Sequence, residues 1–157
     1  MGSGFYGIIA FVIGFSVAQV GKFLIMILRG GGKKYRTFGE FLSDLGRSGG
    51  MPSGHSASFA ALSTVLGLFE GFSSAIFALS LGMTLIIIYD AVNVRYIVGE
   101  HGKLLNEIAR TDKSEKTKPQ KLVEGHTIPQ AIAGILLGIL VGSLVYLAAG
   151  MLAGVSY

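Results

Sequence analysis

The stretch FYGIIAFVIGFSVAQVGKFLIMIL, from Phe5 to Leu28, decides the fold class of this 157-residue chain. Gln19 and Lys22 are its only strongly polar residues. A helix needs roughly 20 apolar residues to cross the hydrocarbon layer of a bilayer, so this stretch is long enough to span a membrane. Three further apolar stretches follow at about 53–68, 72–89 and 128–155. We therefore predict an all-α, polytopic membrane helix bundle with about four transmembrane helices.

The composition agrees with a membrane environment. Hydrophobic residues make up 51% of the chain and charged residues only 14%, whereas soluble domains usually carry about 25% charged residues. The length suits one domain, so we expect residues 1–157 to form a single integral membrane domain. Cysteine is absent, which excludes disulfides, thiolate metal sites and cysteine nucleophiles.

The distribution of basic residues predicts how the bundle is oriented. Four spans place the polar segments 29–52 and 90–127 on one side of the membrane and both termini on the other. These segments contain twelve of the thirteen Lys and Arg residues, five in the first segment and seven in the second. Cytoplasmic loops carry such an excess, so we expect polar loops in the cytoplasm, termini outside, and a multi-pass protein of the cell membrane. The net charge of +4 favours contact with anionic lipid headgroups or an anionic substrate. We expect no nucleic acid partner.

Two histidines lie near expected helix starts on the cytoplasmic side. His55 follows Pro52, Ser53 and Gly54, residue types typical of a helix N-terminus, and His126 precedes the last apolar stretch. Free N–H groups at helix N-termini bind anions such as phosphate. Phosphoryl transfer through a phosphohistidine needs one imidazole to attack phosphorus and another to protonate the leaving oxygen. The pair therefore indicates phosphate chemistry on this side of the membrane.

The motifs around these histidines resemble a known group of proteins. Pro52-Ser53-Gly54-His55 matches the PSGH motif of the type 2 phosphatidic acid phosphatase superfamily. The wider pattern is closest to its divergent branch, the acid phosphatase/vanadium-dependent haloperoxidase-related membrane proteins. The matching pieces, in order, are Ala18-Gln19-x-x-Lys22, Ser48-Gly49-Gly50-Met51-Pro52-Ser53-Gly54-His55-Ser56-Ala57, Tyr89-Asp90-Ala91-x-x-Val94-Arg95, Gly99-Glu100, Asn106 and Gly125-His126.

The resemblance implies roles for particular residues. It makes His126 the nucleophile and His55 the general acid. It makes Ser53 and Gly54 donors to the substrate phosphate. Lys22 takes the place of the superfamily's first-motif lysine, because neither Lys33 nor Lys34 has the Arg-Pro partner that follows that lysine by seven residues.

The chain departs from the superfamily near the nucleophile. Gln120 stands where an arginine is expected six residues before it, and Gln130 where an aspartate is expected four residues after it. A glutamine can orient an imidazole, but it does not stabilise the imidazolium as a carboxylate does. Two sets of residues are candidates to replace the missing groups: the carboxylates Asp90, Glu100 and Glu124, and the phosphate-binding arginines Arg95 and Arg47.

Several alternatives stay open at this stage. Asp90 and Arg95 suit either a site role or a structural ion pair, while Gln19 and Asn106 are supporting candidates. Gly134, Gly138 and Gly142 recur every four residues, and Gly7, Gly14 and Gly21 every seven. Small residues at such spacing let helix backbones approach closely, either inside the bundle or at a homodimer interface.

The sequence thus favours a metal-independent enzyme without cofactors, a phosphatase acting on a phosphomonoester or diphosphate lipid within the lipid bilayer. The alternative is a non-catalytic membrane protein that binds or moves anionic phospholipids through a degenerate phosphatase pocket. A channel is disfavoured, because no run of polar residues crosses the predicted spans.

Overall fold

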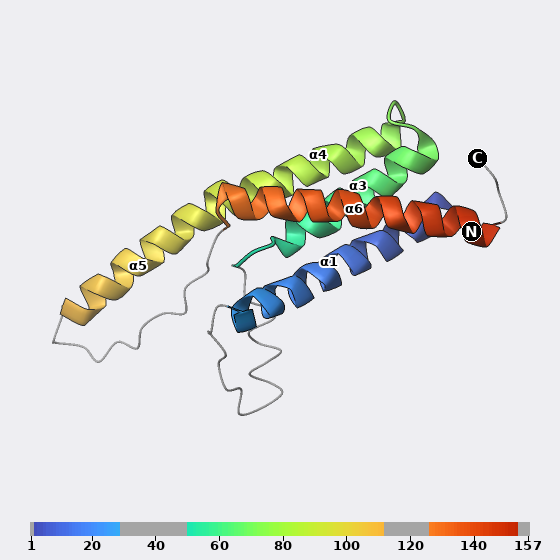
Figure 1. Ribbon diagram of the computed structural model, residues 1–157. Helices are drawn as coiled ribbons and strands as arrows, with labels where there is room; N and C mark the ends of the chain where they lie inside the picture. Colours follow the sequence, from blue (N-terminus) through green and yellow to red (C-terminus); the bar gives the residue numbers. More distant parts are fainter. Residues whose placement is uncertain (1, 29–49, 112–125, 154–157) are drawn as a thin grey trace.

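A computed structural model describes residues 2–28, 50–111 and 126–153, and all regular structure in these ranges is helical (Figure 1). In chain order the helices are α1 (Ser3–Leu28), α3 (Gly54–Glu70), α4 (Ala75–Tyr89), the π-helix η1 (Asp90–Val94), α5 (Arg95–Thr111) and α6 (Ile128–Ala153). Three helical stretches are long and apolar enough to cross a membrane: Ser3–Ile25, Ala75–Ala109 and Ile128–Leu152. The predicted all-α membrane helix bundle is confirmed. The number of spans and their sidedness remain predictions.

The short helix α3 lies at the centre of the bundle, in contact with α1, α4 and α6. Its 17 residues correspond to a length of roughly 25 Å at 1.5 Å per residue. Most of its inward-facing side chains are small, and Ala57, Ala61 and Val65 are completely buried. A helix of small residues lets its neighbours approach closely. In a bilayer the lipid tails are as apolar as the side chains, so helices associate through such close packing and not through the hydrophobic effect.

Both glycine rows face α3. A Cβ atom on Gly134 would lie 2.5 Å from the Ser53 carbonyl oxygen, and one on Gly142 would lie 2.7 Å from the Ala61 carbonyl oxygen. In α1, a Cβ on Gly14 would lie 3.0 Å from the Ala57 carbonyl oxygen. The glycines are therefore used for packing inside the bundle, and the homodimer remains a prediction.

A tight turn and buried hydroxyls join α3 to α4. Gly71 has a φ of +87°, which glycine adopts without strain, and α4 begins at Ala75 behind its N-cap Ser74. Midway along the pair, the Ser63 and Thr84 hydroxyl oxygens are 2.9 Å apart. Thr84 Oγ1 donates to the Ser80 carbonyl at 2.8 Å and can then accept from Ser63, so each buried hydroxyl is satisfied.

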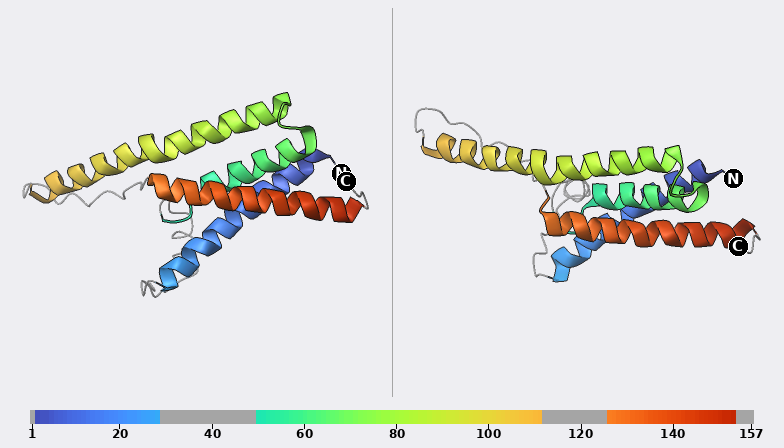
Figure 2. Two further views of the ribbon diagram at one scale, coloured as in Figure 1. Left: turned by 45° about the horizontal axis from the view of Figure 1, so that its top comes forward. Right: turned by 90° about the horizontal axis from the view of Figure 1, so that it is seen from above.

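The helix α4 continues through η1 into α5, as Figure 2 shows. The polar segment that begins at residue 90 is therefore helical at its start, and a π-helix joins it to α4. The α5 segment extends beyond the ends of α3 and α6, and in the left view of Figure 2 it diverges from the C-terminal part of α1. The α1 start, the α3–α4 turn and the α6 end lie at one end of the bundle. The starts of α3 and α6 and the π-helix lie toward the other end.

We predict that Gly138→Ala destabilises the bundle by about 1–3 kcal/mol, the usual cost of overpacking. A Cβ there would lie 2.7 Å from the Ala60 Cβ and 3.0 Å from the Ala61 backbone nitrogen, and backbone atoms cannot move aside cheaply. Thermal unfolding of purified protein in detergent measures the effect. Gly82→Ala is the control, because nothing lies within 4 Å of its added Cβ. Equal melting temperatures for the two variants would contradict the close approach of α6 to α3.

Sidedness is testable because the chain has no native cysteine. Ser73 in the α3–α4 turn and Lys103 on α5 are both exposed. We expect Ser73→Cys to react with a membrane-impermeant maleimide in intact cells, and Lys103→Cys to react only after permeabilisation. The opposite pattern would reverse the predicted orientation.

Candidate functional site

The N-termini of α3 and α6 are joined by a backbone hydrogen bond. Ser53 N–H donates to the Gln130 carbonyl at 3.0 Å. Ser53 is the N-cap of α3, and its Oγ accepts from Ser56 N–H at 3.3 Å and from Ser56 Oγ at 2.9 Å. Such a cap satisfies an amide that the helix leaves unpaired. The helix begins at Gly54 behind this cap, so Pro52 lies just before the helix.

His126 is held at both its backbone and its ring. Its N–H donates to the Ala91 carbonyl at 3.0 Å, and its Nδ1 is 3.4 Å from Gln130 Oε1. The same Oε1 accepts from Thr127 N–H at 3.0 Å. Since Oε1 is an acceptor, the Nδ1 contact places the imidazole proton on Nδ1 and leaves Nε2 with a free lone pair.

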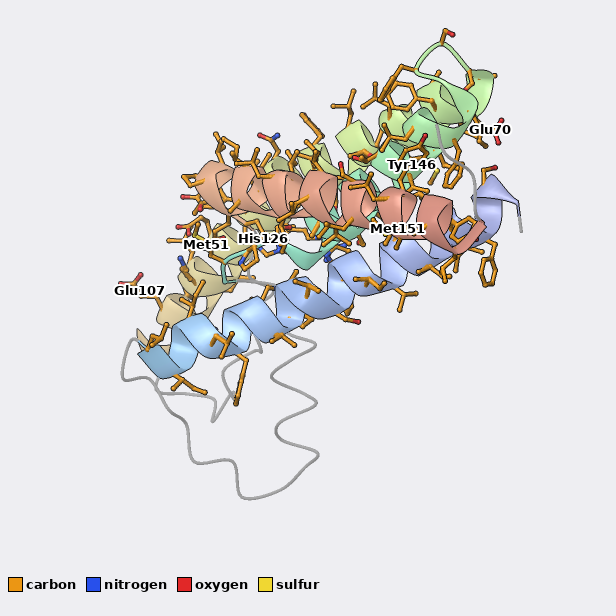
Figure 3. All side chains as sticks on the ribbon, turned by 45° about the vertical axis from the view of Figure 1, so that its right-hand side comes forward. Met51, Glu70, Glu107, His126, Tyr146 and Met151 are labelled. Carbon is orange, nitrogen blue, oxygen red and sulfur yellow. The ribbon has the colours of Figure 1, made fainter. Side chains whose placement is uncertain are left out.

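The Nε2 atom of His126 is buried without a hydrogen-bond partner among the described residues. The residue is only 1% exposed, which makes it the largest fully buried side chain of that set. Figure 3 labels His126 and Met51 at the same end of the bundle, opposite Glu70 and Tyr146. Buried polar atoms are nearly always paired, so this ring nitrogen can still accept a hydrogen bond from water or a ligand, or bond to a ligand atom.

The π-helix supplies the carbonyl that anchors His126. Arg95 N–H bonds to the Asp90 carbonyl five residues back, whereas an α-helix would direct it to Ala91, four residues back. The Ala91 carbonyl is thereby available to His126 N–H. Single π-turns within α-helices occur frequently at functional sites.

The same π-turn brings Asp90 and Arg95 together. Arg95 Nε donates to Asp90 Oδ2 at 2.6 Å. Residues five apart do not face each other on an α-helix, but they do so across a wider turn. The ion pair that the sequence left open is therefore present. Gln130 Oε1, and not Asp90, lies beside Nδ1 of His126, so a catalytic role of Asp90 remains a prediction.

Charged groups from three elements act on the two imidazoles. Burial lowers the pKa of His126 below its ordinary value of 6.5, and the positive charge of Lys22 lowers it further. His55 and Arg95 act in the same direction, while the hydrogen bond with Gln130 raises the pKa. The His55 imidazole in turn interacts electrostatically with Arg95, Lys22 and Asp90. His126 is therefore neutral at neutral pH, the form in which an imidazole is a nucleophile.

The α1 helix contributes Gln19 and Lys22 to the site. A Cβ on Gly54 would lie 3.5 Å from Gln19 Nε2, and a Cβ on Gly50 would lie 3.8 Å from Lys22 Cδ. The Gln19 Oε1 atom is buried and has no hydrogen-bond partner among the described residues. The amide of Gln19 thus lies close to the first residue of α3.

The structure gathers most of the predicted site residues and separates others. Those gathered are Gln19, Lys22, Ser53, Gly54, His55, Asp90, Arg95, His126 and Gln130. Glu100 lies on α5 with its Oε1 2.6 Å from Lys103 Nζ, and Asn106 lies further along the same helix. Glu124, Gln120 and Arg47 lie outside the described residues. Within the described ranges, no cluster of three or more His, Asp or Glu side chains suits a metal ion.

Sequence reasoning missed two backbone carbonyls that fix the site, those of Ala91 and Gln130. Carbonyls leave no residue-type signal. The one available hint was the five-residue spacing of Asp90 and Arg95, which fits an ion pair only on a π-turn.

Comparison with known proteins adds a family match. The Divergent PAP2 family matches residues 6–141 of the chain. "Uncharacterized membrane protein YuiD" of Bacillus subtilis (strain 168) is 35% identical over 107 residues, which cover 59% of this chain and 68% of that protein. No solved structure matches the chain.

We predict that Lys22→Met raises the pKa of His126, because the variant removes the positive charge that lowers it most after burial. Nuclear magnetic resonance of imidazole-labelled protein in detergent follows this titration, and His126→Asn assigns the signal. The control is Lys103→Met, whose ammonium pairs with Glu100 on α5 and should leave the titration unchanged. A downward shift with Lys22→Met would contradict the site geometry.

Proposed function

The chain belongs to the Divergent PAP2 family, and we propose that it is a membrane-embedded lipid-phosphate phosphatase. In this proposal it hydrolyses a phosphomonoester or diphosphate lipid through a phosphohistidine intermediate, at the cytoplasmic face of the cell membrane. The family match supports a phosphatase-related membrane protein. The geometry of the described residues supports the proposed roles in nucleophilic attack, phosphate binding and proton transfer.

The observation that carries the proposal is the buried, unpaired Nε2 of His126. The Ala91 carbonyl holds its backbone and Gln130 its Nδ1, so the ring is fixed and the Nε2 lone pair is free to attack phosphorus. A purely structural histidine at 1% exposure would be expected to pair both ring nitrogens.

Positive and polar groups beside the nucleophile suit a phosphate. Lys22 and Arg95 act electrostatically on both imidazoles and would neutralise the non-bridging oxygens. The N-terminus of α3 would add the amides near Gly54. Ser53 is completely buried, and its Oγ already caps α3 by accepting hydrogen bonds from Ser56. It could bind a phosphate only by donating its own hydroxyl hydrogen.

The reaction then proceeds in two balanced steps. His126 Nε2 attacks phosphorus, the bond from phosphorus to the lipid oxygen breaks, and protonated His55 donates its proton to that oxygen. Water next attacks the phosphorus of the phosphohistidine. His55 takes a proton from this water, the N–P bond breaks, and inorganic phosphate leaves with His126 neutral again. No metal ion enters either step.

A specific observation also supports the rival function. Gln130 holds the ring through a neutral amide, which does not stabilise the imidazolium-like charge of the intermediate as a carboxylate would. Arg95 is already paired with Asp90. A non-catalytic protein that binds or moves anionic phospholipids would keep the same basic, anion-binding end of the bundle without turnover.

Phosphate release separates these functions. We expect purified protein to release phosphate from phosphatidylglycerol phosphate, phosphatidate or a prenyl diphosphate. His126→Ala should lower kcat at least about 1000-fold and His55→Ala about 100-fold or more, as for a lost nucleophile and a lost general acid. Vanadate, which mimics five-coordinate phosphorus, should inhibit.

The matched control is His101→Ala. His101 is exposed on α5, so its loss should change kcat by no more than about twofold. Equal background release by the wild type and all three variants would exclude catalysis and leave the lipid-binding function.

A further inference from the structure

We propose that the hydrocarbon tail of the substrate lies along one stripe of α3, formed by His55, Phe59 and Leu62, and enters the site sideways from the bilayer. This inference rests on the proposed function and identifies Phe59 as a residue that selects lipid-linked over water-soluble phosphoesters.

The burial pattern of α3 defines the stripe. From Ser53 to Gly67 every residue is buried except His55, Phe59, Leu62 and Thr64. The first three recur at positions i, i+4 and i+7 and therefore share one helix face. Thr64 points elsewhere, because its Cβ lies 2.8 Å from the position that a Cβ on Gly142 of α6 would take.

Neighbouring helices border this stripe without burying it. On the α1 side, the Phe11 ring lies 5.2 Å from Phe59, edge to face, and the Phe15 ring lies 6.4 Å from His55. On the α4 side, Thr84 Oγ1 lies 3.2 Å from the Phe59 carbonyl oxygen. The close glycine contacts of α6 occupy the face of Ser53, Ser56, Ala57 and Ala60, so the open stripe faces away from α6.

The two imidazoles differ in solvent exposure, and this difference determines which end of the substrate faces each of them. His126 is 1% exposed, whereas His55 is only half-buried at the head of the stripe. In the proposed reaction His55 protonates the oxygen that leaves with the lipid. The phosphoryl group must therefore lie toward His126, and the first carbons of the lipid must lie at His55, where the stripe begins.

The depth of the site also favours entry from the bilayer. The start of α3 is level with Gly21 of α1, because a Cβ on Gly21 would lie 3.4 Å from Pro52. Helix α1 continues to Leu28 with Leu24, Ile27 and Leu28 exposed, roughly 10 Å further along its axis. Exposed aliphatic side chains of this kind belong in hydrocarbon. The site thus lies below the end of an apolar helix, within reach of a lipid tail.

The test compares phosphatidate with glycerol 3-phosphate, which carries the same phosphomonoester without tails. We expect Phe59→Ala to raise KM for phosphatidate about tenfold, since the ring provides apolar contact to the tail. Its kcat for phosphatidate and its kcat/KM for glycerol 3-phosphate should change by no more than about twofold. The control is Phe72→Ala, which removes a 63% exposed ring at the α3–α4 turn. Equal losses on both substrates, or no change in KM, would overturn the proposal.

A binding measurement keeps this inference separate from the proposed activity. Wild-type protein is photolabelled with phosphatidate that carries a diazirine in one acyl chain, in vesicles of phosphatidylcholine. We expect label on the peptide containing Phe59 or on that containing Phe11 and Phe15, displaced by excess phosphatidate only. Displacement by added phosphatidylcholine would mean that ordinary bilayer lipid fills the stripe and would overturn the proposal. Labelling without any phosphate release would sink the phosphatase function alone.

Discussion

The hydrogen bond from Ser53 N–H to the Gln130 carbonyl, 3.0 Å long, requires the backbones of α3 and α6 almost to touch. Gly134 makes this approach feasible, because a Cβ there would lie 2.5 Å from the Ser53 carbonyl oxygen. His55 is two residues beyond Ser53, and His126 is two residues before α6. Fixing the two helix starts therefore fixes the two imidazoles. In a bilayer, where lipid tails are as apolar as the side chains, close packing of this kind is a principal source of helix association.

The π-turn at Asp90–Val94 completes the site from the third direction. By shifting the Arg95 amide to the Asp90 carbonyl, it provides the Ala91 carbonyl to His126 and pairs Arg95 with Asp90. A regular α-helix through these residues would do neither. His126 is then oriented by the Gln130 side-chain amide and the Ala91 carbonyl, while burial and the nearby cations lower its pKa. His126 is thus a neutral, pre-oriented imidazole, and in the proposed reaction the substrate phosphate would bring the negative charge that Gln130 does not supply.

Much of this arrangement follows from the sequence. Apolar length predicts the helices, four- and seven-residue glycine spacing predicts close packing, and the two motifs predict that His55 and His126 belong to one site. The sequence does not show whether the glycines face the inside of the bundle, because glycines have the same spacing at contacts within a bundle and at contacts between two molecules. It could not reveal the π-turn, because apolar periodicity over five residues does not distinguish 3.6 residues per turn from a wider turn. It could not choose between Gln130 and three carboxylates as the partner of the His126 ring, and the side chain beside Nδ1 is Gln130.

Covalent trapping tests the central claim, that His126 Nε2 is the nucleophile, most directly. The protein is mixed with phosphatidate labelled with radioactive phosphorus and quenched in base, where a phosphohistidine survives, and the labelled peptide is identified by mass spectrometry. Our account predicts label on His126 and none on His55 or His101. Label on His55, or hydrolysis that proceeds with no covalent intermediate at a histidine, would contradict it.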